Sequence, residues 1–112
     1  MTSYSFGDII LVPFPFTDQT DVKKRPAVVV SADRYHDARP DLIIMAVTSQ
    51  LRISSQVDGL IIAAWDKASL PKPSAVKPLF ASIARPLVIR SLGKLTAQDC
   101  HSLRAWMALL LG

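Results

Sequence analysis

Arg25 is the side chain of this sequence best placed to act on an anion. It lies between a polar segment of eight residues, 17–24, and the apolar run from Ala27 to Val30. A strand that begins here would hold the root of the side chain while the guanidinium faces whatever the neighbouring loop encloses. Arg25 is therefore a candidate for binding an anion or for stabilising negative charge in a reaction, with a structural ion pair as the alternative.

Two hydroxyl side chains, Thr48 and Ser49, form the second candidate group, and Gln50 follows them. They come directly after Leu42 to Val47, an apolar run without polar alternation, which is typical of a strand covered on both faces. The end of such a strand fixes the backbone and leaves the side chains at the rim of the sheet. The hydroxyls could serve a ligand there, or they could satisfy the last backbone groups of the strand.

The elements that would position Arg25 are two apolar runs rich in β-branched residues, Ile9 to Val12 and Ala27 to Val30. Because the polar segment 17–24 separates them, they predict a β-hairpin with a long loop. Pro13 cannot donate a hydrogen bond to a strand ladder, so we expect the first strand to stop pairing near that residue.

The rest of the chain predicts a small, strongly bent sheet or barrel, because short apolar pieces alternate with polar joins. These pieces are 57–62, 74–76, 79–83 and 87–90, with a break at Pro78 and a surface connection over 32–41.

The final segment predicts the one clear helix, with Thr96 as a suitable N-cap. An apolar stripe at helical spacing follows, and it should lie on the sheet or on a second subunit. The stripe consists of Leu103, Trp106, Met107, Leu110 and Leu111.

Composition limits the kind of protein further. The 112 residues suffice for one domain, 1–112. With 50% hydrophobic residues and a mean hydropathy of +0.29, we expect a second copy or a partner peptide to cover part of the surface. A net charge of +4 fits either a polyanionic partner or scattered surface lysines. No apolar run reaches the roughly 20 residues of a membrane helix, and the first residues lack secretory features, which predicts a cytoplasmic protein.

Other kinds of chemistry find little support. One cysteine, Cys100, and two histidines far apart, His36 and His101, give no zinc-ligand spacing, so neither a metal site nor a cofactor is expected. A His36–His101 acid–base pair would need the fold to join them, and both are more simply surface residues. We interpret Cys100 as a small buried or half-buried side chain rather than a nucleophile. The four glycines are too isolated to form a phosphate-binding loop.

Several stretches of the chain together resemble the PemK/MazF family, the toxin half of bacterial type II toxin–antitoxin pairs. The first are Gly7-Asp8-Ile9-Ile10-Leu11-Val12 and Lys24-Arg25-Pro26-Ala27-Val28-Val29-Val30-Ser31. The others are Val47-Thr48-Ser49, Leu70-Pro71-Lys72-Pro73-Ser74 and Leu92-Gly93-Lys94-Leu95-Thr96. These five motifs cover almost the whole chain in the family's order, which makes the resemblance specific.

The resemblance implies a mainly β fold with a C-terminal helix, an SH3-like small barrel of the PemK/MazF/CcdB type, assembled as a homodimer. It also implies a sequence-specific endoribonuclease that cleaves single-stranded messenger RNA without a metal and is inhibited by a cognate antitoxin. In the family, residues matching Arg25 and Thr48 are the catalytic pair, with Ser49 as the alternative hydroxyl. Cleavage by the RNA's own 2′-hydroxyl needs the charge of the phosphorane neutralised, and a guanidinium with a hydroxyl donor can do this.

We expect the predicted loop, together with Gln50, to hold phosphates or bases of the RNA. The loop residues concerned are Phe16, Thr17, Asp18, Gln19, Thr20, Lys23 and Lys24. Phe14 and Phe16 could stack on bases, but core or dimer contacts are more typical at an apolar strand end. The proton acceptor stays open, because an arginine with a pKa above roughly 12 is a poor base. Asp18 and Asp21 are candidates by residue type.

One segment departs from the family pattern. Where many relatives carry a polar residue and then Thr-Ile-Asp, this chain has Leu79-Phe80-Ala81-Ser82-Ile83-Ala84. Two alternatives to the nuclease stay open, and the changes in this segment concern the second of them. One is a non-catalytic binding protein, such as a gyrase inhibitor on the same barrel, which would not need Arg25 and Thr48. The other is a degenerate member retained for binding an antitoxin.

Overall fold

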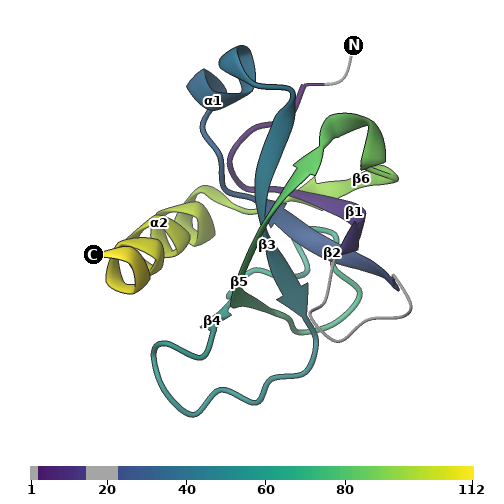
Figure 1. Ribbon diagram of the computed structural model, residues 1–112. Helices are drawn as coiled ribbons and strands as arrows, with labels where there is room; N and C mark the ends of the chain where they lie inside the picture. The colour runs from purple at the N-terminus through teal and green to yellow at the C-terminus, as the bar shows by residue number, and fades with distance from the viewer. Residues whose placement is uncertain (1–2, 15–22) are drawn as a thin grey trace.

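A computed structural model describes residues 3–14 and 23–112 of the chain (Figure 1). Over these residues the elements follow one another as β1 (Asp8–Phe14), β2 (Lys23–Val29), α1 (Asp33–Ala38), β3 (Asp41–Thr48), β4 (Leu60–Ile61), β5 (Ala75–Ala84), the 3-10 turn η1 (Arg85–Leu87), β6 (Arg90–Lys94) and α2 (Ala97–Leu111).

The strands form one antiparallel sheet in the order β4-β5-β3-β2-β1-β6. The sheet curls into a half-barrel, and α2 lies to one side of it (Figure 1). This confirms the predicted fold, a mainly β small barrel with a C-terminal helix. The side chains of β3 pack in apolar clusters on both faces of the sheet, Met45 and Val47 on one face and Leu42, Ile44 and Ala46 on the other, which explains why Leu42 to Val47 is apolar without alternation.

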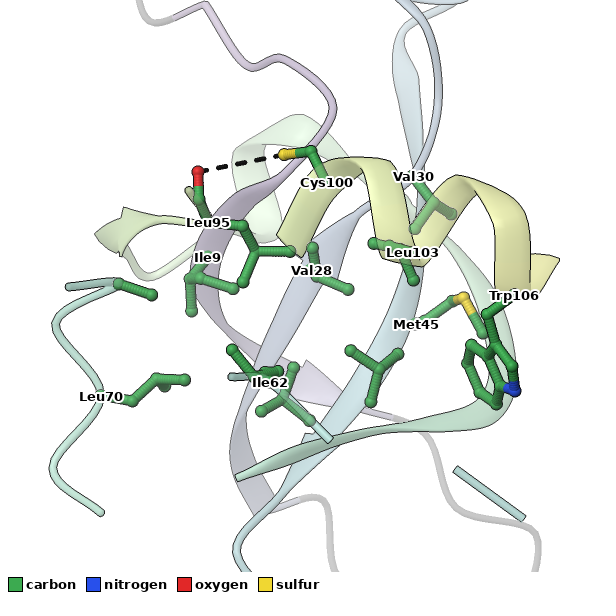
Figure 2. Packing of buried hydrophobic residues seen from close by; sticks show 13 residues of the cluster. Ile9, Val28, Val30, Met45, Ile62, Leu70, Leu95, Cys100, Leu103 and Trp106 are labelled. Carbon is green, nitrogen blue, oxygen red and sulfur yellow. Dashed lines mark hydrogen bonds between the residues drawn. The ribbon is translucent and has the colours of Figure 1, made fainter. Parts of the chain in front are cut away.

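Side chains alternate along the strands between two apolar clusters, one on each face of the sheet. Ile9 and Val28 belong to the helix-side cluster, whereas their neighbours Ile10 and Ala27 belong to the inner cluster. Figure 2 shows α2 lying across the helix-side cluster, with Leu103 pointing into it. Each fully buried aliphatic side chain contributes about 1.5–3 kcal/mol, so the two clusters together hold the curl of the sheet.

Polar bonds fix the first turn of α2. The Thr96 hydroxyl accepts a hydrogen bond from the Asp99 backbone N–H at 3.2 Å, which confirms Thr96 as the N-cap. The Asp99 carboxylate is buried and accepts from the backbone N–H groups of Ala63 and Ala64 at 3.0 and 2.9 Å. This one carboxylate therefore ties the start of α2 to the turn that follows β4.

Most of the apolar stripe of α2 packs on the sheet, one of the two places predicted for it. Leu103 and Trp106 are buried against the sheet, and Met107 and Leu110 pack at the margin of the helix-side cluster. Leu111 is 65% exposed instead of buried, because α2 ends there, beyond the sheet (Figure 1). The indole Nε1 of Trp106 donates to the Gln56 carbonyl at 2.5 Å, which attaches the loop after β3 to the helix.

β1 ends near Pro13, as predicted, although Pro13 itself still pairs. β1 continues to Phe14, and Pro13 is paired with Lys24 of β2. β6 pairs with β1 only from Asp8 to Leu11, so among the described residues β1 has a single neighbour beyond that point. A strand edge tolerates the missing N–H of a proline, and the ladder with β2 can therefore go on.

The prediction that Pro78 breaks the strand was wrong, because β5 is one strand from Ala75 to Ala84. Its register against β3 shifts between the pairs Met45–Phe80 and Val47–Val76, and Pro78 falls inside this irregularity. A bulge accommodates a proline without ending the strand.

Three further segments differ from the sequence prediction. The surface connection over 32–41 contains α1, and the strand predicted over 57–62 shrinks to Leu60–Ile61. Of the strand predicted over 87–90, Leu87 ends η1 and Arg90 begins β6, because Pro86 inside η1 favours a helical backbone there.

Candidate active site

Arg25 lies exposed in β2, opposite Val12 of β1. The pairing of β2 with β3 begins only at Ala27, which is opposite Ala46. Pro26 accounts for this limit, because it lacks the N–H that a strand paired on both sides would use. Among the described residues, the start of β2 is therefore paired with β1 alone.

The resulting two-stranded extension, residues 12–14 with 23–25, is called the β1–β2 ribbon below. It extends past the last β2–β3 pair and carries Arg25 together with Lys23 and Lys24, all three exposed. The ribbon thus presents a cluster of positive charge at one end of the sheet. Phe16, Thr17, Asp18, Gln19 and Thr20 and the candidate base Asp21 lie outside the described residues.

Thr48 ends β3 at the same end of the sheet and is half-buried. Ala27 and Ala46 form the last pair between β2 and β3 at this end of the sheet. Thr48 follows Ala46 by two residues and Arg25 precedes Ala27 by two. Because the two strands are antiparallel, both residues lie just outside that pair, at the same end. Ala27 and Ala46 belong to the inner cluster, and side chains two apart in a strand share a face. Arg25 and Thr48 therefore occupy neighbouring strand ends on the same face.

The Thr48 hydroxyl already has one partner. Its Oγ1 accepts from the Gln50 backbone N–H at 3.1 Å, and a hydroxyl that accepts in this way keeps its own hydrogen for donation. Ser49 and Gln50 follow and are exposed. Phe14, in contrast, is only 2% exposed within the inner cluster, which confirms it as a core residue rather than a surface for stacking bases.

A hollow of about 50 Å³ adjoins Thr48. The end of β3, the loop after it and the start of β5 supply its polar lining, namely Thr48, Gln50, Arg52, Asp58 and Lys77. The sequence reasoning did not select Arg52, Asp58 or Lys77. A signal for Lys77 was present, because it lies in a long stretch, 67–98, that contains no acidic residue.

Asp58 is held as an anion beside this hollow. The Ser54 hydroxyl and the Ser54 backbone N–H donate to its Oδ2 at 2.5 and 3.1 Å, and the hydroxyl bond lowers the pKa of Asp58 most. A carboxylate with a lowered pKa is a weak proton acceptor at neutral pH. Asp58 is therefore better suited to accept hydrogen bonds from a ligand than to act as a general base.

The other titratable residues considered from sequence lie elsewhere. The prediction that His36 is a surface residue was wrong: its side chain is 8% exposed, and Nε2 lies 2.5 Å from Ser31 Oγ. His36 and His101 come from α1 and α2, which are well separated in Figure 1. Cys100 is buried as predicted, and burial raises its pKa, which makes it a poor nucleophile.

Among the described residues, no helix has the length and apolar character needed to cross a membrane. The same residues contain no group of three or more His, Cys, Asp or Glu side chains that could hold a metal ion.

The family model for PemK-like, MazF-like toxins of type II toxin–antitoxin systems matches residues 5–111, and the chain belongs to this family. Among solved structures, the chain resembles an endoribonuclease in complex with its cognate antitoxin from a mycobacterial species. The TM-score is 0.74 at 14% identity, over 100% of this chain and 96% of that one. No curated protein matches in a sequence comparison.

Proposed function

We propose that this toxin is a sequence-specific, metal-independent endoribonuclease that cleaves single-stranded messenger RNA. The observation that carries the proposal is the shared position of Arg25 and Thr48, past the last β2–β3 pair on one face of the sheet. Family membership supports it, and so does the fold shared with an endoribonuclease.

The reaction we propose is attack by the 2′-oxygen of the substrate on its neighbouring phosphorus. The bond from phosphorus to the 5′-oxygen breaks, which leaves a cyclic 2′,3′-phosphate and a free 5′-hydroxyl. Arg25 would neutralise the charge that grows on the non-bridging oxygens, and Thr48, with Ser49 as the alternative, would donate to one of them. Arginine cannot take the 2′-hydroxyl proton, because its pKa is above roughly 12, so another group or water must accept it.

The polar groups around the hollow would hold the flanking nucleotides. Arg52 and Lys77 supply positive charge for phosphates, and Lys23 and Lys24 do so on the ribbon. The Gln50 side chain offers an amide donor and an acceptor, and the Asp58 carboxylate offers acceptors. Such groups can hydrogen-bond to the edge of an unpaired base. RNA contacts from Phe16, Thr17, Asp18, Gln19 and Thr20 remain part of the proposal.

We also propose a cognate antitoxin and a second copy of the chain as partners. Large apolar side chains are exposed on several elements, which favours an assembly larger than one chain. They include Leu51, Val57, Ile61, Leu79, Phe80, Leu87, Ile89, Leu109 and Leu111. Light scattering coupled to size-exclusion chromatography should therefore give twice the chain mass.

An RNA cleavage assay in EDTA tests the enzymatic proposal. We expect the wild type to cut a long RNA, and Arg25→Ala to lower the rate by about 10²- to 10³-fold, because a donor to the transition-state charge is lost. Arg34→Ala, an exposed arginine on α1, is the matched control and should cut normally. An inert wild type would support the non-catalytic toxin-fold protein instead, and an Arg25→Ala variant of full activity would remove Arg25 from the mechanism.

A further inference from the structure

The loop between β3 and β4, residues 49–59, supplies three of the polar side chains around the hollow beside Thr48, namely Gln50, Arg52 and Asp58. The loop has no helix or strand of its own. Side chains on such a loop can hold a ligand in one place only when other contacts fix the backbone that carries them. The contacts that hold this loop therefore matter for the proposed RNA site.

The far part of the loop, residues 54–58, is a closed turn. The Ser54 hydroxyl and backbone N–H donate to the Asp58 carboxylate at 2.5 and 3.1 Å, and the Asp58 backbone N–H donates to the Ser55 carbonyl at 3.2 Å. These bonds lie within the turn, so they fix its shape. They do not fix its place on the protein, which requires a contact with another element.

Trp106 of α2 makes that contact. Its Nε1–H donates at 2.5 Å to the carbonyl of Gln56, in the middle of the turn and 50 positions away in the sequence. Among the hydrogen bonds of the described residues, this is the one that joins turn 54–58 to another element. The indole is 6% exposed, and Figure 2 shows it at the margin of the helix-side cluster, with its nitrogen directed away from the core side chains.

The same helix also holds the chain after β4. The buried Asp99 carboxylate accepts from the backbone N–H groups of Ala63 and Ala64, as described above. α2 is thus bonded to the chain on both sides of β4, at Gln56 before the strand and at these two alanines after it. A helix packed on the sheet core is a rigid frame from which to hold a loop.

We propose that Trp106 is a positioning residue for RNA binding: through Gln56 it fixes turn 54–58, and with the turn it fixes Arg52 and Asp58 beside Thr48. The inference rests on the proposed function, because it concerns the same RNA site. Arg25 and Thr48 are carried by β2 and β3 and do not depend on the loop. Loss of the indole N–H should therefore weaken RNA binding and leave the chemical step unchanged.

The Trp106→Phe variant tests this inference, because it keeps an aromatic ring in the core and removes the donor. The Kd for an RNA whose scissile 2′-hydroxyl is replaced by hydrogen should rise about tenfold, while the cleavage rate at saturating RNA stays within about twofold of the wild type. The backbone amides of Ser54 and Asp58 should exchange hydrogen about tenfold faster in the free protein, as NMR can measure.

Two further proteins separate the hydrogen bond from the packing of the ring. Trp65→Phe removes the same atoms from a tryptophan that also packs against the helix-side cluster, but in the turn after β4, and it should leave RNA binding and amide exchange unchanged. Replacement of Trp106 by 3-benzothienylalanine keeps the bicyclic ring and places sulfur where the N–H was. It should reproduce the effects of Trp106→Phe. Thermal melting of each protein shows that it remains folded.

The outcomes distinguish this inference from the nuclease proposal. Wild-type Kd and amide exchange in the benzothienyl protein overturn the positioning role, and cleavage by the wild type then leaves the nuclease intact. A cleavage rate at saturating RNA that falls as far as the affinity also overturns it, because the loop would then act on the chemical step. Weaker RNA binding in Trp106→Phe, with a wild type that binds but does not cut, supports the positioning role and removes the nuclease. A wild type that neither binds nor cuts RNA overturns both.

Discussion

The two ends of β3 differ in how their polar groups are used. At the first residue, Asp41 accepts from the Tyr35 hydroxyl at 2.6 Å and from Arg39 Nε at 3.2 Å. Nearby, Arg85 donates to the backbone carbonyls of His36 and Arg39. At the last residue, Thr48 has its one bond to Gln50 and lies beside a hollow with cationic walls.

This difference between the two ends of β3 supports placing the proposed active site at the Thr48 end. We call the Asp41 end closed because the polar groups of Asp41 and Arg85 bond within the protein and stabilise the connection between α1 and the sheet, although a hollow lined by His36 and Arg85 adjoins this end as well. The Thr48 end loses its β2–β3 pairing and exposes donors and positive charge that the core does not need. A rigid strand with one closed and one open end positions such groups without flexibility at their roots.

Thr48→Val is the strongest test of the contrast. Valine keeps the shape and removes the hydroxyl donor, so RNA cleavage should fall about 100-fold while the melting temperature stays that of the wild type. Single-turnover rates and thermal unfolding monitored by circular dichroism measure the two quantities. A variant that cuts at the wild-type rate would show that the open end of β3 takes no part in the reaction through Thr48.

Arg52→Ala tests whether the Thr48 end of β3 binds RNA phosphates, through the salt dependence of RNA binding. Each phosphate neutralised on a single strand contributes a slope of about 0.7 to the plot of log affinity against log salt. Loss of Arg52 should therefore reduce that slope by about 0.7, measured with an RNA whose scissile 2′-hydroxyl is replaced by hydrogen. Arg39→Ala, at the closed end, is the control and should keep the wild-type slope. An unchanged slope in Arg52→Ala would place this arginine outside the RNA site.

Asp41→Asn concerns the closed end and has the smallest expected effect. The hydrogen bond from Tyr35 lowers the pKa of Asp41, so its contribution to stability is present above the ordinary aspartate pKa of 3.8 and is lost as the pH falls through the folded value. The wild type should melt above Asp41→Asn at neutral pH, and the difference should shrink in acid. Asp58 is present in both proteins, so its contribution to the pH dependence of stability is the same in each and does not affect the difference. A difference that persists in strong acid would contradict this account, and cleavage at neutral pH should be equal.

The sequence predicted the elements whose signal is local. Apolar runs located β1, β2 and β3, the N-cap Thr96 located α2, and the family motifs gave the barrel. Pro78 does not break β5 as predicted, because it falls where the register of β5 against β3 shifts, and no local sequence pattern reveals that shift. The prediction that His36 is a surface residue failed for a similar reason, because α1, which the sequence did not predict, places His36 against Ser31.

The candidate site was predicted only in part for the same reason. Arg25 comes shortly before an apolar run and Thr48 comes directly after one, and a sequence displays such boundaries directly. Arg52, Asp58 and Lys77 come to the hollow from a loop and from β5, and their meeting depends on a shifted register that no local pattern records.

The β1–β2 ribbon has an implication for how such toxins diverge. Its residues extend past the pairs that join β2 to β3 and β1 to β6, so lengthening or shortening it leaves those pairs intact. Related chains can therefore differ in the length of this ribbon while they keep the fold of the sheet.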